Sequence, residues 1–325
     1  MFNIKLSDKY KVNINGGSSK GTQDKYRKDN FWYKEDKLGN EGYVEYLISL
    51  VLKFSTLPES DYVSYEYGRI NDKNGCRSKD FSKEIYQFYS LERLHKNITG
   101  VGLTERTRLL DTPELRKDYV LKFFNKYYSI DLGNYFSKIF FVDLISLNED
   151  RHFNNLGVLV DRGNYSEAPI FDNGVSLLNG NISVRNSLSI EENVRRVVSR
   201  PFSGSPEVQY SLFKSNIKID YIGLLNELSK EKDSFTLDIL RYNILKYKEL
   251  FCVDYNKQGL YYRGKQLGTR YSYMGLVYDV DCIEKCDREL ELIDCGAMYK
   301  TDDEINGSIT VINVERGNLI HGRDN

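Results

Sequence analysis

The first part of the chain alternates between polar and apolar residues and is divided by turn signals. Residues 3–15 alternate and end at a glycine loop, which predicts a strand entering that loop. The aromatic stretch 31–34 predicts a second strand. Residues 62–70 alternate again, residues 72–75 are a strong turn signal, and residues 76–81 predict the returning strand of a hairpin. These segments together predict a small mixed β-sheet.

Other segments carry apolar residues at intervals of three and four, the spacing of an amphipathic helix. The first such helix is expected to begin at Glu41, directly after the second strand. Beyond the hairpin, the same spacing predicts a mainly helical second lobe, with a short hairpin over residues 156–171. The helices predicted there cover residues 82–96, 113–128, 134–147, 189–200, 218–231 and 235–252.

This pattern predicts an α+β fold with two lobes. The N-lobe is expected to span residues 1–82 and the C-lobe residues 83–325. A chain of 325 residues suits two lobes, because single hydrophobic cores stop growing at about 250–300 residues. The tail after residue 254 is rich in tyrosine and glycine without a clear period, and we assign it only loosely to the C-lobe.

Composition excludes several classes of protein. The chain is 40% hydrophobic and 29% charged, the balance of a globular protein. Its 46 basic and 47 acidic side chains nearly cancel, so no long-range field favours nucleic acid or an anionic membrane. The most apolar stretch, Phe136 to Leu147, is interrupted by Lys138 and Asp143 and is too short for a membrane span.

The sequence also indicates where the protein is made. The N-terminal residues alternate in polarity and do not form the apolar core of a cleavable signal peptide, so we expect the mature chain to begin at Met1. Five cysteines in a chain with a full-sized core require no disulfide framework. Synthesis in a reducing cytoplasm is therefore expected.

A polar loop, NEDRHFNN, follows the most apolar predicted helix and contains Asp150, His152 and Asn155. Asp172 lies at the far end of the hairpin that follows. A loop and a hairpin end can bring Asp150, Asn155 and Asp172 to one point. Phosphoryl transfer needs a group that orients the acceptor hydroxyl and oxygen ligands for magnesium, so we predict Asp150 for the first role and Asn155 with Asp172 for the second.

Two simpler interpretations of this loop stay open. Acidic and amide residues commonly do no more than cap a turn, and Asp150 and Asn155 could have that role alone. His152 is one of only three histidines and lacks metal-ligand spacing, so we expect it to brace the loop.

The glycine loop of residues 16–21 adds independent support, because backbone amides in such a loop can surround phosphate oxygens. Lys34 follows at the end of the next predicted strand, and Glu41 and Glu45 lie at the start of the helix. That order provides a lysine that can contact phosphate and a carboxylate that can hold the lysine in place. The alternative is an ordinary hairpin with a solvated lysine, which the downstream polar loop makes less favourable.

In these places, and in this order, the chain resembles the HipA-like serine/threonine kinases. The resemblance covers about residues 12–178, and the shared order is more specific than any single motif. The matched segments are the phosphate loop at residues 18–25, the phosphate-contacting Lys34, the helix start Asn40-Glu41, the catalytic loop at residues 148–155 and the metal-binding segment at residues 169–172.

The resemblance implies a bilobal protein-kinase-like fold that uses ATP and Mg²⁺ to phosphorylate serine or threonine of a protein. It implies catalysis by Asp150 with Lys34 and Asn155, adenine bound near residues 79–82, and autophosphorylation at Ser18. For Ser18 the alternative is a loop hydroxyl that binds its own backbone. The residues expected to contact ATP are Ser18, Ser19, Lys20, Gly21, Thr22, Gln23, Lys25, Lys34 and Glu41.

One departure from the family concerns catalysis. Asn154 stands where the family's namesake has a lysine, so cationic help at the transferred phosphate must come from Lys34, from Arg151 or from neither. This departure gives some support to a rival hypothesis, a pseudokinase that acts as a nucleotide-binding interaction module, whereas the retention of Asp150, Asn155 and Asp172 argues against it. A weaker rival is a metal-dependent phosphohydrolase that uses Asp150, His152 and Asp172, but it lacks the histidines such sites usually have.

A second departure concerns partners. The glycine loop lies only a few residues into the chain, so the subdomain that precedes it in the family is not expected and an antitoxin partner is not assumed. Small secreted members of the family resemble the chain in this respect. That resemblance implies protein substrates in a host cell and export from a bacterial cytoplasm without a cleavable signal.

Overall fold

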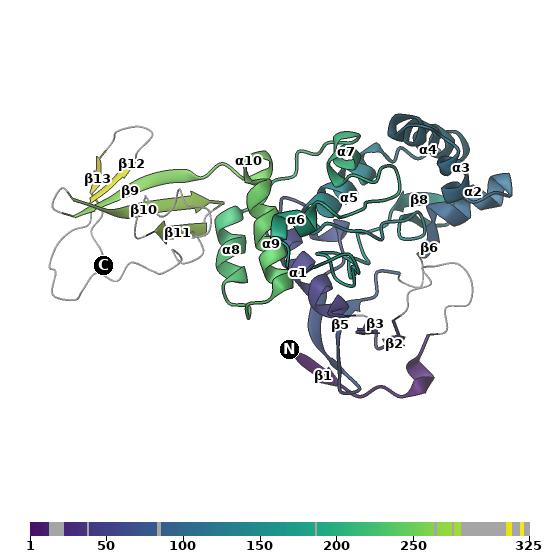
Figure 1. Ribbon diagram of the computed structural model, residues 1–325, viewed down its shortest axis with the longest axis horizontal. Helices are drawn as coiled ribbons and strands as arrows, with labels where there is room; N and C mark the ends of the chain where they lie inside the picture. The colour runs from purple at the N-terminus through teal and green to yellow at the C-terminus, as the bar shows by residue number, and fades with distance from the viewer. Residues whose placement is uncertain are drawn as a thin grey trace. The chain divides into compact units, whose positions relative to one another are not determined.

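A computed structural model describes residues 1–12, 23–37, 39–82, 86–185, 187–262, 265–274, 276–280, 310–313 and 319–321. The chain divides into two compact units (Figure 1). The first contains Met1–Ile217 and Ser234–Asn243, and the second contains Lys218–Asp233 and the described part of Ile244–Asn325. The predicted lobe boundary at residue 82 falls inside the first unit and stays a prediction.

The first unit begins with a five-stranded sheet in the order β1-β4-β5-β3-β2. Only β1 and β4 are parallel, and the other neighbours are antiparallel. The strands are β1 (Phe2–Ile4), β2 (Lys25–Lys28), β3 (Phe31–Glu35), β4 (Tyr65–Ile70) and β5 (Lys73–Lys79). One buried cluster at this sheet consists of Leu6, Tyr26, Tyr33 and Ile70.

The sheet corrects two predictions. The long strand over residues 3–15 is wrong, because β1 ends at Ile4 and a 3₁₀ turn, Asp8–Tyr10, follows; residues 13–22 lie outside the described part. The turn between β4 and β5 lies at Asn71-Asp72, where both residues have positive φ, 50° and 67°. Asparagine and aspartate tolerate this conformation, so the hairpin closes earlier than the glycine signal indicated.

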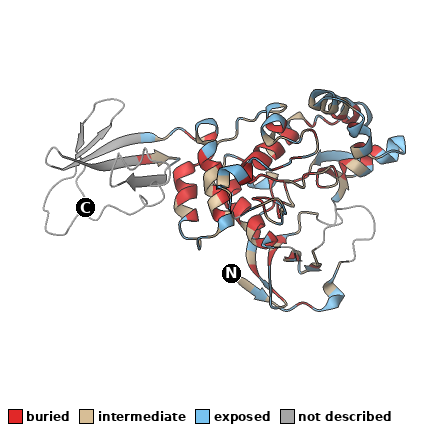
Figure 2. Ribbon diagram, viewed as in Figure 1, coloured by how far each residue is buried: buried red, intermediate tan, exposed pale blue. Residues whose placement is uncertain are grey.

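Helix α1 (Glu41–Lys53) forms as predicted and packs on β4 and β5. Its apolar face is buried, and Figure 2 shows most of the helix in the buried class. The first turn of α1 approaches β5 closely, since a Cβ on Gly42 would lie 2.5 Å from the carbonyl carbon of Gly75. Gly42 and Gly75 therefore allow α1 to lie close to β5, the strand that pairs with β3.

The core of the helical part is α5 (Gly133–Ser146), close to the predicted 134–147 and almost entirely buried (Figure 2). Phe136 and Phe140 pack against Phe202, with ring centroids 5.3 and 5.6 Å apart. The buried Asn243 side chain donates to two carbonyls in the last turn of α5, at 2.7 and 2.8 Å. The end of α5 is thereby held rigidly, just before the polar loop.

A second sheet corrects the predicted helix over residues 82–96. Residues Gln87–Ser90 form β6, and the helix begins only at Leu91, where the Ser90 side chain accepts from the amide of Arg93 at 3.2 Å. β6 pairs with β7 (Gly157–Asp161), and β7 pairs with β8 (Asn164–Glu167). The predicted returning strand, 168–171, is also wrong, because the tight turn at residues 162–163 makes β8 start at Asn164.

The other helices of the first unit are α2 (Leu91–Thr99), α3 (Leu103–Arg108), α4 (Pro113–Tyr128), α6 (Ile190–Val194), α7 (Pro206–Ser211) and most of α9 (Phe235–Lys246). Of these, α4 matches its prediction, α6 is shorter than predicted, and α3 and α7 were not predicted.

The described residues of the second unit include α8 (Tyr221–Leu228), the last turn of α9 and α10 (Lys248–Phe251), together with a sheet in the tail where no period was found. The order of this sheet is β11-β10-β9-β12-β13, with antiparallel neighbours. Among the described helices of the whole chain, none combines the length and apolarity needed to cross a membrane. The strands are β9 (Asn256–Tyr262), β10 (Lys265–Tyr273), β11 (Leu276–Val280), β12 (Thr310–Asn313) and β13 (Leu319–His321).

Candidate active site

A buried lysine, Lys34 of β3, joins two carboxylates from distant parts of the chain. Its Nζ donates to Glu45 Oε1 of α1 at 2.6 Å and to Asp172 Oδ1 at 2.8 Å. A third bond goes to the hydroxyl of Tyr65 at 3.3 Å, and the ammonium lies 4.9 Å from the centre of that ring. The Lys34 side chain is only 9% exposed, so it is not the solvated lysine of the simpler interpretation.

The charges of this group are strongly coupled. Burial would lower the pKa of Lys34, but Asp172 and Glu45 outweigh it and raise that pKa well above its usual range. Burial would likewise raise the pKa of Asp172, but Lys34 and Lys25 outweigh it and hold that pKa well below the usual range. Lys34 is therefore cationic and Asp172 anionic at neutral pH.

The polar loop after α5 is held by its own side chains. The helix ends at Ser146, and the next residue, Leu147, takes a left-handed conformation with φ of 56°. Asn148 Oδ1 accepts from the amide of Asp150 at 2.9 Å, and Asn155 Nδ2 donates to the carbonyl of Asp150 at 3.2 Å. The amide of Asn155 also donates to the carbonyl of His152 at 2.8 Å. The Asp150 carboxylate stays accessible, with 43% of its side chain exposed.

Arg151 ties this loop to the segment that carries Asp172. It is completely buried and donates from Nε and Nη2 to Asp143 of α5, at 3.0 and 2.9 Å. It also donates to the carbonyl of Phe171 at 2.8 Å and to Asn173 Oδ1 at 2.6 Å. Sequence analysis left Arg151 as a possible cation for the transferred phosphate, but these bonds make it a positioning residue.

The two halves of the site form one continuous network. The amide of Asn173 donates to Glu45 Oε2 at 2.9 Å, and the side chain of Asn173 accepts from Arg151 at 2.6 Å. Because Glu45 also binds Lys34, Asn173 connects the hydrogen bonds of Arg151 to those of Lys34. Sequence analysis missed Asn173, and it noted Asp143 only as a charge within an apolar helix. We use the name buried network for Lys34, Glu45, Asp143, Arg151, Asp172 and Asn173.

Asn155 and Asp172 have the chemistry of a magnesium site. Asn155 Oδ1 is buried and accepts no hydrogen bond within the described part of the chain, while Nδ2 is engaged by Asp150. Asp172 is held in the deprotonated form, and its φ of 62° is a strained conformation of the kind that gathers at functional sites. Carboxylate and amide oxygens are the ligands that Mg²⁺ prefers, so these residues fit the ion.

The remaining predicted nucleotide contacts are only partly covered by the structure. Gln23 and Lys25 are described, and Lys25 lies in β2 directly opposite Lys34. Glu41 is buried and accepts from two backbone amides of the turn before α1, at 3.1 and 3.3 Å, whereas Glu45 makes the contact with Lys34. Residues outside the described part are Ser18, Ser19, Lys20, Gly21 and Thr22.

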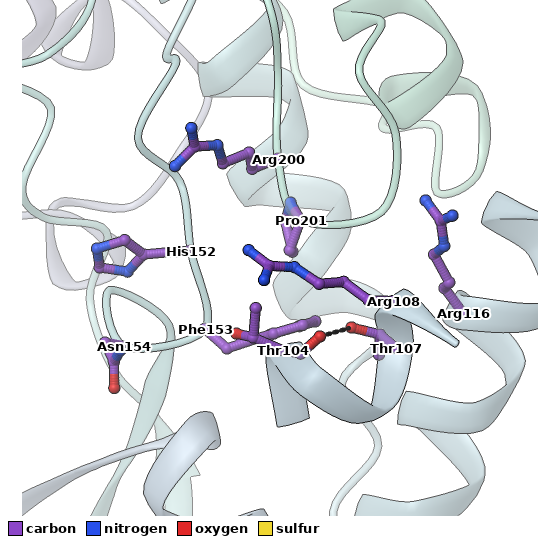
Figure 3. A pocket seen from close by; sticks show the side chains of 9 residues that line it. All are labelled: Thr104, Thr107, Arg108, Arg116, His152, Phe153, Asn154, Arg200 and Pro201. Atoms are coloured by element: carbon purple, nitrogen blue, oxygen red, sulfur yellow. Dashed lines mark hydrogen bonds between the residues drawn. The ribbon is translucent and has the colours of Figure 1, made fainter. Parts of the chain in front are cut away.

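Two side chains lie beside Asp150: Arg200, which no sequence motif indicated, and His152, which was expected to brace the loop. Arg200 Nη1 is 3.8 Å from Asp150 Oδ1, and His152 Nε2 is 3.8 Å from Asp150 Oδ2. Arg108 of α3 lines the same cavity as Arg200 and His152 (Figure 3). No local pattern could have indicated this meeting, because the residues come from separate parts of the sequence.

The chain has a bilobal protein-kinase-like fold of the α+β class. This fold combines a sheet that packs against helix α1, a mainly helical part, and the buried network. No protein-family model matches the chain, and no curated protein matches it by sequence. The crystal structure of a Helicobacter pylori proinflammatory kinase, CtkA, is similar, with a TM-score of 0.52 and 16% identity over 77% of this chain and 95% of that chain. The likeness confirms the predicted fold and, at the level of fold, the resemblance to HipA-like kinases.

A second similar structure is HipA of Shewanella oneidensis in its complex with HipB and operator DNA. It has a TM-score of 0.31 and 10% identity, over 75% of this chain and 57% of that chain.

Proposed function

We propose that the chain is an ATP-dependent protein serine/threonine kinase. The observation that carries the proposal is the buried Lys34, held between a glutamate of α1 and the aspartate that follows the hairpin. A cation fixed in this way can contact the phosphates of a nucleotide, and positioning with electrostatic stabilisation supplies most of the catalysis of phosphoryl transfer. The fold likeness to CtkA supports the same class of activity.

In the proposed reaction, the hydroxyl oxygen of a serine or threonine bonds to the γ-phosphorus of ATP. The bond from that phosphorus to the β,γ-bridging oxygen breaks, and ADP leaves with the electron pair. Asp150 accepts the hydroxyl proton, because its carboxylate is accessible while the backbone around it is held by Asn148 and Asn155. Asn155 and Asp172 would hold magnesium, which neutralises phosphate charge when bound.

The proposal includes three finer statements. Adenine binds near residues 79–82, between β5 and the segment that leads to β6. Ser18 is an autophosphorylation site. The substrates include proteins of a host cell, which the similarity to CtkA, a proinflammatory kinase, supports.

The test uses the purified chain with γ-labelled ATP and magnesium, and measures label on the chain itself and on casein as a generic acceptor. Asp150→Ala and Asp172→Ala should each abolish labelling, whereas Asp118→Ala, an exposed carboxylate of α4, should not. Full labelling in both site variants would contradict the proposal.

Two further measurements address the alternatives. ATP binding by the wild-type chain without any transfer would favour the pseudokinase. Phosphopeptide mapping of the labelled chain should find Ser18 modified, and an unmodified Ser18 would remove that statement alone.

A further inference from the structure

A cavity of about 420 Å³ lies beside the polar loop (Figure 3), and two of the residues that line it, His152 and Arg200, contact Asp150. Three arginines and one histidine are among the residues that line it, and no carboxylate is. We call it the arginine pocket. Its lining consists of Thr104, Thr107, Arg108, Arg116, His152, Phe153, Asn154, Arg200 and Pro201.

The three arginines differ in how far the protein already uses them. Arg116 donates to the carbonyls of Leu110 and Phe202, at 3.0 and 2.9 Å, and so braces the wall. The side chain of Arg108 has no hydrogen bond or ion pair within the described part of the chain. Among the described residues, the side chain of Arg200 has only the 3.8 Å contact with Asp150, and it is 61% exposed. Two guanidinium groups are therefore available to a ligand.

These groups face the same space. In Figure 3, Arg108 extends from α3 toward the side of the pocket where His152 and Arg200 lie. His152 adds a buried Nδ1 that has no hydrogen-bond partner among the described residues. Guanidinium groups that face one space, with no carboxylate among the residues that line it, suit a planar or tetrahedral anion, which can accept paired N–H bonds from each of them.

The position of the pocket indicates which anion it takes. Asp150, the proposed acceptor of the hydroxyl proton, is 3.8 Å from both Arg200 and His152. The pocket shares no residue with Lys34 or with the two carboxylates that bind it. The nucleotide phosphates and this anion would therefore occupy separate places. An anion beside Asp150 would belong to the molecule that carries the acceptor hydroxyl.

A neighbouring cavity adjoins the arginine pocket and has both signs of charge in its lining. It shares Arg108 and Asn154 with the arginine pocket and adds Arg93, Lys96 and Glu105. Glu92 also lines it, but its carboxylate already accepts from the amide and hydroxyl of Thr104, at 2.9 and 2.8 Å.

We propose that the arginine pocket binds a negatively charged side chain of the substrate peptide, close in sequence to the serine or threonine that is phosphorylated. The inference deepens the proposed kinase function and rests on it for the identity of the acceptor. The anion is a carboxylate or a phosphate, which share this chemistry. The chain as a whole is nearly neutral, so recognition depends on contact in the pocket rather than on a long-range field.

The test measures binding, and transfer is measured separately. Fluorescein-labelled peptides with one central serine carry aspartate, phosphoserine, glutamine or lysine at the flanking positions. Fluorescence anisotropy with the full chain should show roughly tenfold tighter binding of an acidic peptide than of the glutamine peptide, as expected for charge-assisted hydrogen bonds. The aspartate and phosphoserine peptides distinguish the two sources of the anion.

Variants locate the binding. Arg108→Ala and Arg200→Ala should each remove most of the acidic preference, and Arg108→Glu should reverse it toward the lysine peptide. Arg162→Ala changes an exposed arginine in the turn between β7 and β8 and should keep the preference. Circular dichroism confirms that each variant is folded.

The outcomes separate this inference from the proposed function. Wild-type protein that binds acidic and glutamine peptides equally would overturn the pocket, even if it transfers phosphate. An equal loss in Arg162→Ala would also overturn it. A retained acidic preference in a chain that transfers no phosphate would overturn the kinase proposal and leave the pocket as an acidic-peptide site.

Discussion

The buried network and the arginine pocket each contain several charged side chains, but they are built in opposite ways. In the buried network, Lys34 and Arg151 are enclosed, and protein carboxylates and carbonyls accept their hydrogen bonds. In the arginine pocket, Arg108 and Arg200 are exposed and lack close protein partners within the described residues. The first arrangement fixes geometry before a ligand arrives, and the second leaves charge for a ligand to neutralise.

The largest effect is expected where the buried network loses a fully enclosed charge. Arg151→Met removes the partner of Asp143, which is buried and would be left without its ion pair. The free energy of unfolding in urea should fall by about 3–5 kcal/mol. Arg151→Met combined with Asp143→Leu should recover much of the loss, because it buries no charge. A loss below about 1 kcal/mol in the single variant would show that the pair is not structural.

The second effect concerns transfer. Lys34→Met keeps the length of the side chain but removes the cation between Glu45 and Asp172. Transfer of label from ATP should fall by roughly 10²–10³-fold, the usual cost of losing one preorganised electrostatic contact. Lys73→Met is the matched control, since Lys73 pairs with Glu35 but is 62% exposed in its side chain. Transfer that stays within a few fold of wild type in Lys34→Met would remove the buried network from the mechanism.

The third effect is a pH dependence of stability. The pKa of Asp172 is lowered in the folded chain by Lys34 and Lys25, which outweigh burial. Its contribution to stability is therefore present above the unfolded value of about 4 and is lost as pH falls through the lowered folded pKa. Thermal unfolding between neutral and strongly acidic pH should show a steeper acid loss for wild type than for Asp172→Asn. Parallel curves would contradict the coupling.

The smallest effect is expected in the arginine pocket. Arg108→Ala and Arg200→Ala should change the free energy of unfolding by no more than about 0.5 kcal/mol, because neither guanidinium is tied to the fold. Arg116→Ala, from the same pocket, should cost about 1–3 kcal/mol, since it leaves two carbonyl acceptors without their donor. If urea unfolding gives equal losses for all three, the distinction between braced and available arginines is wrong.

The sequence predicted the fold best in segments where apolar residues recur at a single spacing and where capping or turn residues mark the ends. Helices α1 and α4 begin and end close to the predicted residues, since α1 has a regular apolar face and α4 starts at a Thr112 cap followed by Pro113. Strand β6 was predicted as helix, because four residues are too few to show an alternation before the helix begins at Leu91. Its strand conformation comes from pairing with β7, a long-range contact.

The sequence by itself determined which residue types are present at the candidate site and in what order, and so which chemistry could be predicted for it. The glycine loop, Lys34 and Glu41, followed in order by the polar loop and Asp172, led to the prediction of phosphoryl transfer, because each residue type suits one part of that reaction. Only the tertiary structure decided which carboxylate of α1 holds Lys34, that Arg151 is a buried brace, and that Arg108 and Arg200 gather beside Asp150. Burial and hydrogen-bond partners depend on residues far apart in the chain, so no local pattern carries them.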